Sequence, residues 1–338
     1  MITSKGADLQ KNSIQIWVPI VLSLAVLAAI ALFTVEPDTL PLLGQTRWGL
    51  LALAPFVVGL RVIFGAWRLH YIAKGFLKFS AALRAQLAWD FFSCITPSSI
   101  GGGPIVPAYI AKDSRVSLGD SSAIMLFAML LDQIWFACAI VVVLLSTTSI
   151  DVIPDSLGNI GMLTLITYFL GYLAWVIIFA YGALKKPEVL SWVVRRVFML
   201  PGLRRFGSKA DSILQDLQER ATILRSQRLV FFLNGFGLTL LAWASRYALV
   251  VLIVAATAPE IDYILAGLRS IVTMLGALVV PTPGGAGGAE GLFALLVGPL
   301  LPQALVSPAA LIWRVLGYYV FLAAGAYLTL DSALRNHK

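Results

Sequence analysis

Eight charged side chains stand in segments that are otherwise apolar, where an ionised group is costly unless it has a partner or a function. They are Arg61, Arg84, Asp90, Asp132, Arg246, Arg269, Glu290 and Arg314. Five are bases and three are acids, so two positive charges remain if every acid pairs with one base. Guanidinium groups bind phosphate bidentately, so this surplus favours an anionic ligand such as a phosphate group.

Several of these residues also have a purely structural interpretation. Arg61 and Arg84 lie close enough to one end of their segments for their long side chains to snorkel to the membrane surface. Asp132 and Arg246 lie near the middle of theirs, where they could form a buried ion pair with no other role. The sequence leaves both interpretations open beside a role in binding.

Two short segments rich in proline and glycine interrupt apolar regions. "TPSSIGGGP" at 96–104 aligns without a gap on "TPGGAGGAE" at 282–290, with identical Thr, Pro and two Gly positions. The candidate binding residues in these breaks are Thr96, Pro97, Gly101 and Gly102 in the first, and Thr282, Pro283, Gly284, Gly285 and Gly287 in the second. Glycine lets a ligand or a helix approach the backbone closely, and the N–H groups at the start of a helix can receive an anion.

An irregular backbone cannot face lipid, so each break must be buried in protein or line a water-filled cavity. A glycine-rich kink that only packs helices together is the alternative. Glu290 falls in the first turn of the helix that follows the second break, where a carboxylate is favourable to the helix dipole. We predict that this carboxylate lies close to Arg314, one helix away.

The composition indicates an integral membrane protein made of helices. Of the 338 residues, 59% are hydrophobic and only 12% are charged, whereas soluble domains carry about 25% charged residues. We expect one transmembrane domain over 1–338, with six segments long enough to span the roughly 30 Å hydrocarbon core. The predicted spans are 14–34, 48–69, 119–146, 160–182, 229–257 and 304–330.

The distribution of Lys and Arg predicts the orientation of these spans. The segment 183–228 carries ten basic residues against four acidic ones, so it should be cytoplasmic, while 147–159 has two aspartates and no base. Counting spans from these loops places both termini in the cytoplasm. The two broken regions, 76–111 and 262–301, then each begin and end on one side, as re-entrant helical hairpins do. Three spans separate the two breaks, which predicts an inverted-topology repeat with a site near the midplane.

The second break and the helix after it resemble a known family. "PTPGGAGGAE" at 281–290, followed by "ALIWRVLGYYVFLAAG" at 310–325, is similar to the lysylphosphatidylglycerol synthase transmembrane-region family, whose members are also called flippase-like proteins. The residues that fit its pattern are Pro281, Pro283, Gly284, Gly285, Gly287, Glu290 and Arg314. The first half departs from that pattern, with Gly103, Pro104 and Val106 after the break and Asp132-Gln133 in place of Glu-Arg.

This resemblance covers roughly 14–330 and implies lipid translocation across the membrane. The bifunctional members carry a soluble aminoacyl-transferase domain, which we do not expect here, because the sequence ends eight residues after 330. We therefore expect no synthase activity, although an intramembrane enzyme using Asp90, Asp132 or Glu290 stays an alternative. No ATP-binding or H-E-x-x-H motif occurs, and Cys94 and Cys138 suit small core residues, so neither a cofactor nor a metal is expected.

We expect a protein of the inner, or plasma, membrane that moves a lipid with an anionic headgroup between leaflets. Such a lipid could be a phospholipid or a polyprenyl phosphate. The alternatives are a secondary transporter of a small soluble anion and a non-transporting accessory protein of envelope-lipid assembly. The net charge of +8 is expected to meet lipid headgroups, not nucleic acid, and self-association is compatible with the sequence.

The predicted topology can be checked by cysteine labelling. A cysteine introduced beside Pro154 should react with an impermeant maleimide in intact cells, because 147–159 is predicted to be outside. A cysteine beside Lys209 should react only after permeabilisation. The reverse pattern would remove the basis for the inverted repeat.

Overall fold

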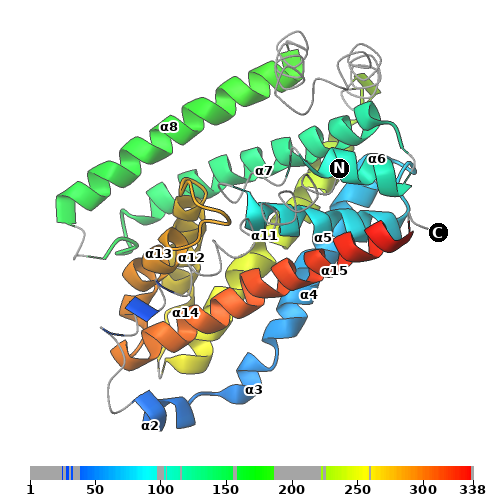
Figure 1. Ribbon diagram of the computed structural model, residues 1–338. Helices are drawn as coiled ribbons and strands as arrows, with labels where there is room; N and C mark the ends of the chain where they lie inside the picture. The colour runs from blue at the N-terminus through cyan, green and yellow to red at the C-terminus, as the bar shows by residue number, and fades with distance from the viewer. Residues whose placement is uncertain are drawn as a thin grey trace, which may run out of the picture.

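The structure, a computed structural model, describes residues 39–96, 105–114, 116–154, 158–185, 226–258 and 260–335, with a few isolated positions elsewhere. The elements in these ranges are helices joined by short connections (Figure 1). The predicted span 14–34, most of the predicted cytoplasmic segment 183–228, and Pro97, Gly101 and Gly102 lie outside the described residues.

Four helical stretches in the described residues are long and apolar enough to cross a membrane. They are Trp48–Ala73, Leu118–Ser146, Leu229–Thr257 and Gln303–Gly325. They agree with the predicted spans 48–69, 119–146, 229–257 and 304–330. The predicted span 160–182 lies within a fifth long helix, α8 (Gly158–Lys185), at the outside of the bundle beside α7 (Leu118–Ser146) (Figure 1). The chain is thus an all-α, multi-pass membrane protein.

The first half of the described chain runs through short helices into a long one and then a broken pair. Thr39–Gly44 (α2) and Trp48–Leu51 (α3) lead into α4 (Ala54–Ala73), which ends where Lys74 adopts a left-handed conformation with φ 48°. Next come α5 (Phe79–Ile95) and α6 (Val106–Ser114), on either side of the first break. Ser117 then caps α7, its hydroxyl accepting from the N–H of Asp120 at 3.0 Å.

The second half repeats this order. The long helix α11 (Leu229–Thr257) is followed by α12 (Tyr263–Ala277), the second break and α13 (Gly288–Leu296). Two short 3₁₀ turns, η3 (Gly298–Leu300) and η4 (Gln303–Leu305), then lead into a continuous helical run. That run consists of α14 (Val306–Arg314), the π-helical η5 (Val315–Tyr319) and α15 (Val320–Arg335). The two leading helices, α4 and α11, pack along each other.

The helices that enter the two breaks are short for a membrane crossing. A transmembrane helix needs about 20 residues to span the hydrocarbon core, whereas α5 has 17 residues and α12 has 15. Each packs against the short helix on the other side of its break, α5 against α6 and α12 against α13. Both broken regions therefore form helical hairpins. Their re-entrant placement in a membrane and their opposite orientations stay predictions.

The two breaks meet inside the molecule, although they are far apart in the sequence. The N–H of Gly284 donates to the carbonyl of Thr96 at 3.2 Å, and the hydroxyl of Tyr318 donates to the carbonyl of Cys94 at 3.1 Å. These bonds satisfy carbonyl groups at the C-terminal end of α5, which has no further helical turn to do so. Backbone groups freed by the first break are thus partnered by the second break and by η5 in the last helical run.

Glycines allow the close contacts that join the halves. Gly284 has φ 59°, and a Cβ there would lie 2.3 Å from the ring of Tyr318 and 3.0 Å from the carbonyl oxygen of Cys94. Elsewhere along α5, a Cβ at Gly325 would lie 2.1 Å from Phe91. Small residues that let helix backbones approach are the usual means of packing where both helices are apolar.

Replacing Gly284 by alanine should disrupt the contact between the two breaks. The added Cβ meets Tyr318 and the Cys94 backbone, and the left-handed conformation disfavours any Cβ, so we expect a loss of roughly 2–4 kcal/mol in stability. Gly291→Ala is the matched control, because it lies on the exposed face of α13 with nothing within 4 Å. Thermal unfolding in detergent measures both; equal midpoints would contradict the close packing at Gly284.

Candidate functional site

A cavity of about 130 Å³ lies next to the place where the two breaks meet. Its walls come from α4, α5, α7, α11, α12, the second break and the α14–η5 run, so both halves of the chain contribute. A water needs roughly 10–15 Å³ by this measure, so the cavity has room for about ten waters or for a phosphate group with its substituents. Its charged lining residues are Arg61, Arg68, Asp90, Asp132, Arg246 and Arg314.

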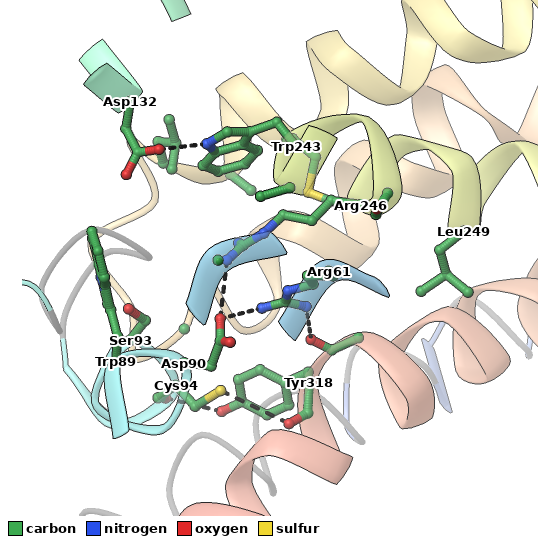
Figure 2. A pocket seen from close by; sticks show the side chains of 18 of the residues that line it. Arg61, Trp89, Asp90, Ser93, Cys94, Asp132, Trp243, Arg246, Leu249 and Tyr318 are labelled. Atoms are coloured by element: carbon green, nitrogen blue, oxygen red, sulfur yellow. Dashed lines mark hydrogen bonds and ion pairs between the residues drawn. The ribbon is translucent and has the colours of Figure 1, made fainter. Parts of the chain in front are cut away.

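Asp90 of α5 stands between two arginines from different helices. Arg61 of α4 donates to its Oδ1, and Arg246 of α11 donates to the same oxygen at 3.0 Å (Figure 2). Gln86, one turn earlier on α5, donates to Oδ2 at 3.1 Å. Arg61 also donates to the carbonyl of Gly317 in η5 at 3.2 Å. Both oxygens of the buried Asp90 carboxylate are therefore used, and one of them is shared by two cations.

Asp132 of α7 forms a second cluster, with a partner that the sequence interpretation did not name. Its Oδ1 accepts from Arg68 of α4 and from the indole N–H of Trp243 at 2.7 Å. The suggested ion pair between Asp132 and Arg246 is therefore wrong. Arg246 lies one turn beyond Trp243 on α11, with its guanidinium 4.4 Å from the centre of the Trp243 ring, and bonds to Asp90 instead.

Glu290 and Arg314 form the third cluster, as the sequence predicted. Their side chains are 2.6 Å apart, and Glu290 is completely buried. The same Glu290 oxygen also accepts from the N–H of Gly287, at 2.8 Å, at the start of α13. Arg314 also donates to the carbonyls of Gly284 and Gly285 at 3.5 and 3.3 Å, which holds the second break against α14. The π-helical segment η5 begins directly after Arg314, and such segments are frequent at functional sites.

The remaining predicted residues lie outside the cavity lining. Arg84 pairs with Asp113 at the surface, where 37% of its side chain is exposed, so the snorkelling interpretation suits Arg84. The same interpretation is wrong for Arg61, which is buried against Asp90. Arg269 donates to the carbonyls of Asp151 and Val152, which anchors the α7–α8 connection.

Among the described break residues that were predicted to bind, only Gly284 lines the cavity. Thr96 provides the carbonyl that Gly284 contacts, and Thr282 bonds within its own turn, to the carbonyl of Ala286 at 2.7 Å. Gly285 and Gly287 have positive φ, 66° and 85°, and Pro283 lies in the same turn; these residues shape the loop.

Arg68 and Gln86 are two buried polar lining residues that the sequence reasoning missed. Arg68 lies at the end of the predicted span 48–69. A spacing of seven residues puts it on the same helical face as Arg61, which is the signal that could have found it. Gln86 precedes Asp90 by four residues, the spacing at which helical side chains interact.

Several buried polar atoms of the cavity have no hydrogen-bond partner in the described part of the chain. They are Nε of Arg61, Arg68 and Arg314, and Oε1 of Gln86. Buried donors and acceptors are normally satisfied, so these atoms suit a ligand or ordered water. The described residues contain no group of three or more His, Cys, Asp or Glu side chains that could hold a metal ion. The arrangement can therefore bind an anion with guanidinium donors.

Comparison with known proteins gives two matches that cover nearly the whole chain. The family model described as "Lysylphosphatidylglycerol synthase TM region" matches residues 17–325. A protein of Archaeoglobus fulgidus described as a UPF0104 membrane protein is 25% identical over 320 residues, covering 94% of this chain and 97% of the relative. The family match includes the two breaks and all of the cavity-lining residues.

Asp90→Asn should be strongly destabilising, because it leaves the partly buried Arg61 and Arg246 beside a neutral group. Breaking a buried ion pair typically costs about 3–5 kcal/mol. Asp113→Asn removes the surface partner of Arg84 and should cost about 0–1 kcal/mol. Unfolding by SDS, followed by tryptophan fluorescence, compares the two. Equal losses would show that Asp90 does not organise the cavity.

Proposed function

Because the chain belongs to the lysylphosphatidylglycerol synthase TM region family, we propose that it translocates a lipid with an anionic headgroup across the inner membrane. Family membership supports a lipid-related role in the membrane. The specific step, headgroup transfer between leaflets, rests on the cavity. Its arginines lie between the two halves of the chain, which is where carriers with inverted repeats bind their substrates.

One observation carries the proposal: Asp90 is shared by Arg61 and Arg246. An anionic headgroup that approaches this site can take one of the two guanidinium groups as its partner and leave Asp90 paired with the other. Arg246 is the accessible member, with 25% of its side chain exposed against 11% for Arg61. The headgroup would therefore meet Arg246 first, while its acyl chains stay in lipid.

The two hairpins provide a route for alternating exposure of this site. Between their described residues, one backbone hydrogen bond joins them, from Gly284 to Thr96. A small movement of one hairpin tip would break this contact without unfolding either hairpin. Arg314 of α14 holds the second tip through its bonds to the Gly285 carbonyl and to Glu290. A phosphate that replaced Glu290 as the partner of Arg314 would release the tip. The sequence contains no ATP-binding motif, so translocation down a concentration gradient is the simplest form of the proposal.

Arg246→Gln should reduce the initial rate of lipid translocation at least tenfold. The test uses proteoliposomes with fluorescently labelled phosphatidylglycerol and a dithionite quench that reads out each leaflet. Arg228→Gln is the control, because Arg228 is an exposed base at the start of the same helix, outside the cavity lining. Both variants should unfold at temperatures close to that of the wild type.

Wild-type translocation by a folded Arg246→Gln variant would contradict the proposed site. If phosphatidylglycerol does not move but radiolabelled glycerol phosphate enters the vesicles, the protein is a transporter of small anions instead. If neither moves, the accessory role in envelope-lipid assembly gains support. The matched control separates these outcomes from a general loss of positive charge.

A further inference from the structure

The charges around the cavity do not cancel. Four arginines, Arg61, Arg68, Arg246 and Arg314, face three carboxylates among the described residues, so four minus three leaves one positive charge. The carboxylates are Asp90, Asp132 and Glu290. In a site of low dielectric, a ligand that cancels this single charge binds best, because any remaining charge is costly to bury.

The surplus charge can be located. Arg68 pairs with Asp132 and Arg314 pairs with Glu290, one base to one acid in each case. At Asp90 two guanidinium groups share one oxygen. The uncompensated charge therefore lies at Arg61 and Arg246, on the facing sides of α4 and α11.

Side-chain atoms without a hydrogen-bond partner belong to residues that line the same cavity. Nε of Arg61 has no acceptor in the described residues, and neither does Nε of Arg68, whose residue is only 4% exposed. Gln86, 3% exposed, uses its amide N–H for Asp90 and leaves Oε1 without a donor. This carbonyl lies over Gly65 of α4, where a Cβ would be 2.5 Å away, so the glycine makes room for it. The cavity can thus donate to phosphate oxygens and accept one hydrogen bond from a hydroxyl or amine.

We propose that the site, if it is the translocation site proposed above, selects headgroups with one net negative charge on a phosphodiester. Phosphomonoesters carry close to two charges above their second pKa of roughly 6, and would leave one negative charge buried. A zwitterionic headgroup brings its own cation and leaves the positive charge of the cavity uncompensated. Selection is therefore set by charge count, with Gln86 favouring a headgroup that has a hydrogen-bond donor.

The test is equilibrium competition on the detergent-purified protein at pH 8, against a fluorescent phosphatidylglycerol. Dihexanoyl phosphatidylglycerol, a monoanionic diester, should compete at least tenfold better than dihexanoyl phosphatidic acid or dihexanoyl phosphatidylcholine. Equal competition by phosphatidic acid overturns the proposal. Glycerophosphoglycerol, the same diester without acyl chains, is the soluble arm. If it competes as well as the lipid, the charge rule is supported and the ligand source is a soluble anion.

Two variants change the charge count without removing a carboxylate. Ser93→Lys adds a cation one turn from Asp90 on a partly buried lining position, and should raise the affinity for phosphatidic acid at least tenfold relative to phosphatidylglycerol. Arg246→Gln brings the net charge around the cavity to zero and should remove the preference for phosphatidylglycerol over phosphatidylcholine. Arg228→Gln should change neither the affinity for phosphatidic acid relative to phosphatidylglycerol nor that for phosphatidylglycerol relative to phosphatidylcholine. Unchanged ratios in both folded cavity variants would show that charge count does not set selectivity.

The translocation assay separates this inference from the proposed function. If phosphatidylglycerol and phosphatidic acid are moved and bound equally well, the protein translocates lipids but the charge rule is wrong. If phosphatidylglycerol is bound selectively but not moved, the charge rule stands and translocation is wrong.

Discussion

The position of Asp90 between Arg61 and Arg246 is the interaction on which the rest of the site depends. A guanidinium group away from water must have an acceptor, and the nearest one here belongs to another helix. Through these bonds α4, α5 and α11 are held together, and the further bond from Arg61 to Gly317 adds η5. Close packing of α4 along α11 brings the two arginines to the same carboxylate. The geometry of the cavity follows from the need to satisfy these charges.

The second constraint concerns the backbone. A helix that stops inside the molecule leaves carbonyls without partners at its end, and the cost of leaving them bare is high at membrane depth. The end of α5 is satisfied by Gly284 and Tyr318, so the second break acts as a cap for the first hairpin. Only a glycine fits at 284, since a side chain would overlap Tyr318 and its φ is positive. The contact between the two hairpins therefore stabilises the end of α5.

Much of the fold could be predicted from the sequence, because long apolar runs and proline-glycine breaks are local signals. The predicted span 229–257 coincides with α11, and the hairpins fall largely within 76–111 and 262–301. The pairing of charges could not be predicted in the same way. Asp132 could reach Arg246 or Arg68 as far as spacing shows, and helix packing places it against Arg68. The prediction that Glu290 lies close to Arg314 is confirmed. Both residues belong to one family motif, on the consecutive helices α13 and α14.

The paired carboxylates explain how the proposed anion site can hold its arginines before any anion arrives. Four bare arginines in an apolar cavity would repel one another and oppose folding, whereas internal carboxylates neutralise most of that charge. A ligand phosphate then replaces an existing partner instead of filling a void, so the gain on binding is the difference between two similar interactions. A carrier needs such a small difference, because a headgroup that gains too much would remain bound and stop the cycle. In the proposed mechanism, the single uncancelled charge of the Arg61–Arg246 pair would set the size of that difference, and the carboxylates would pair with the arginines again when the ligand leaves.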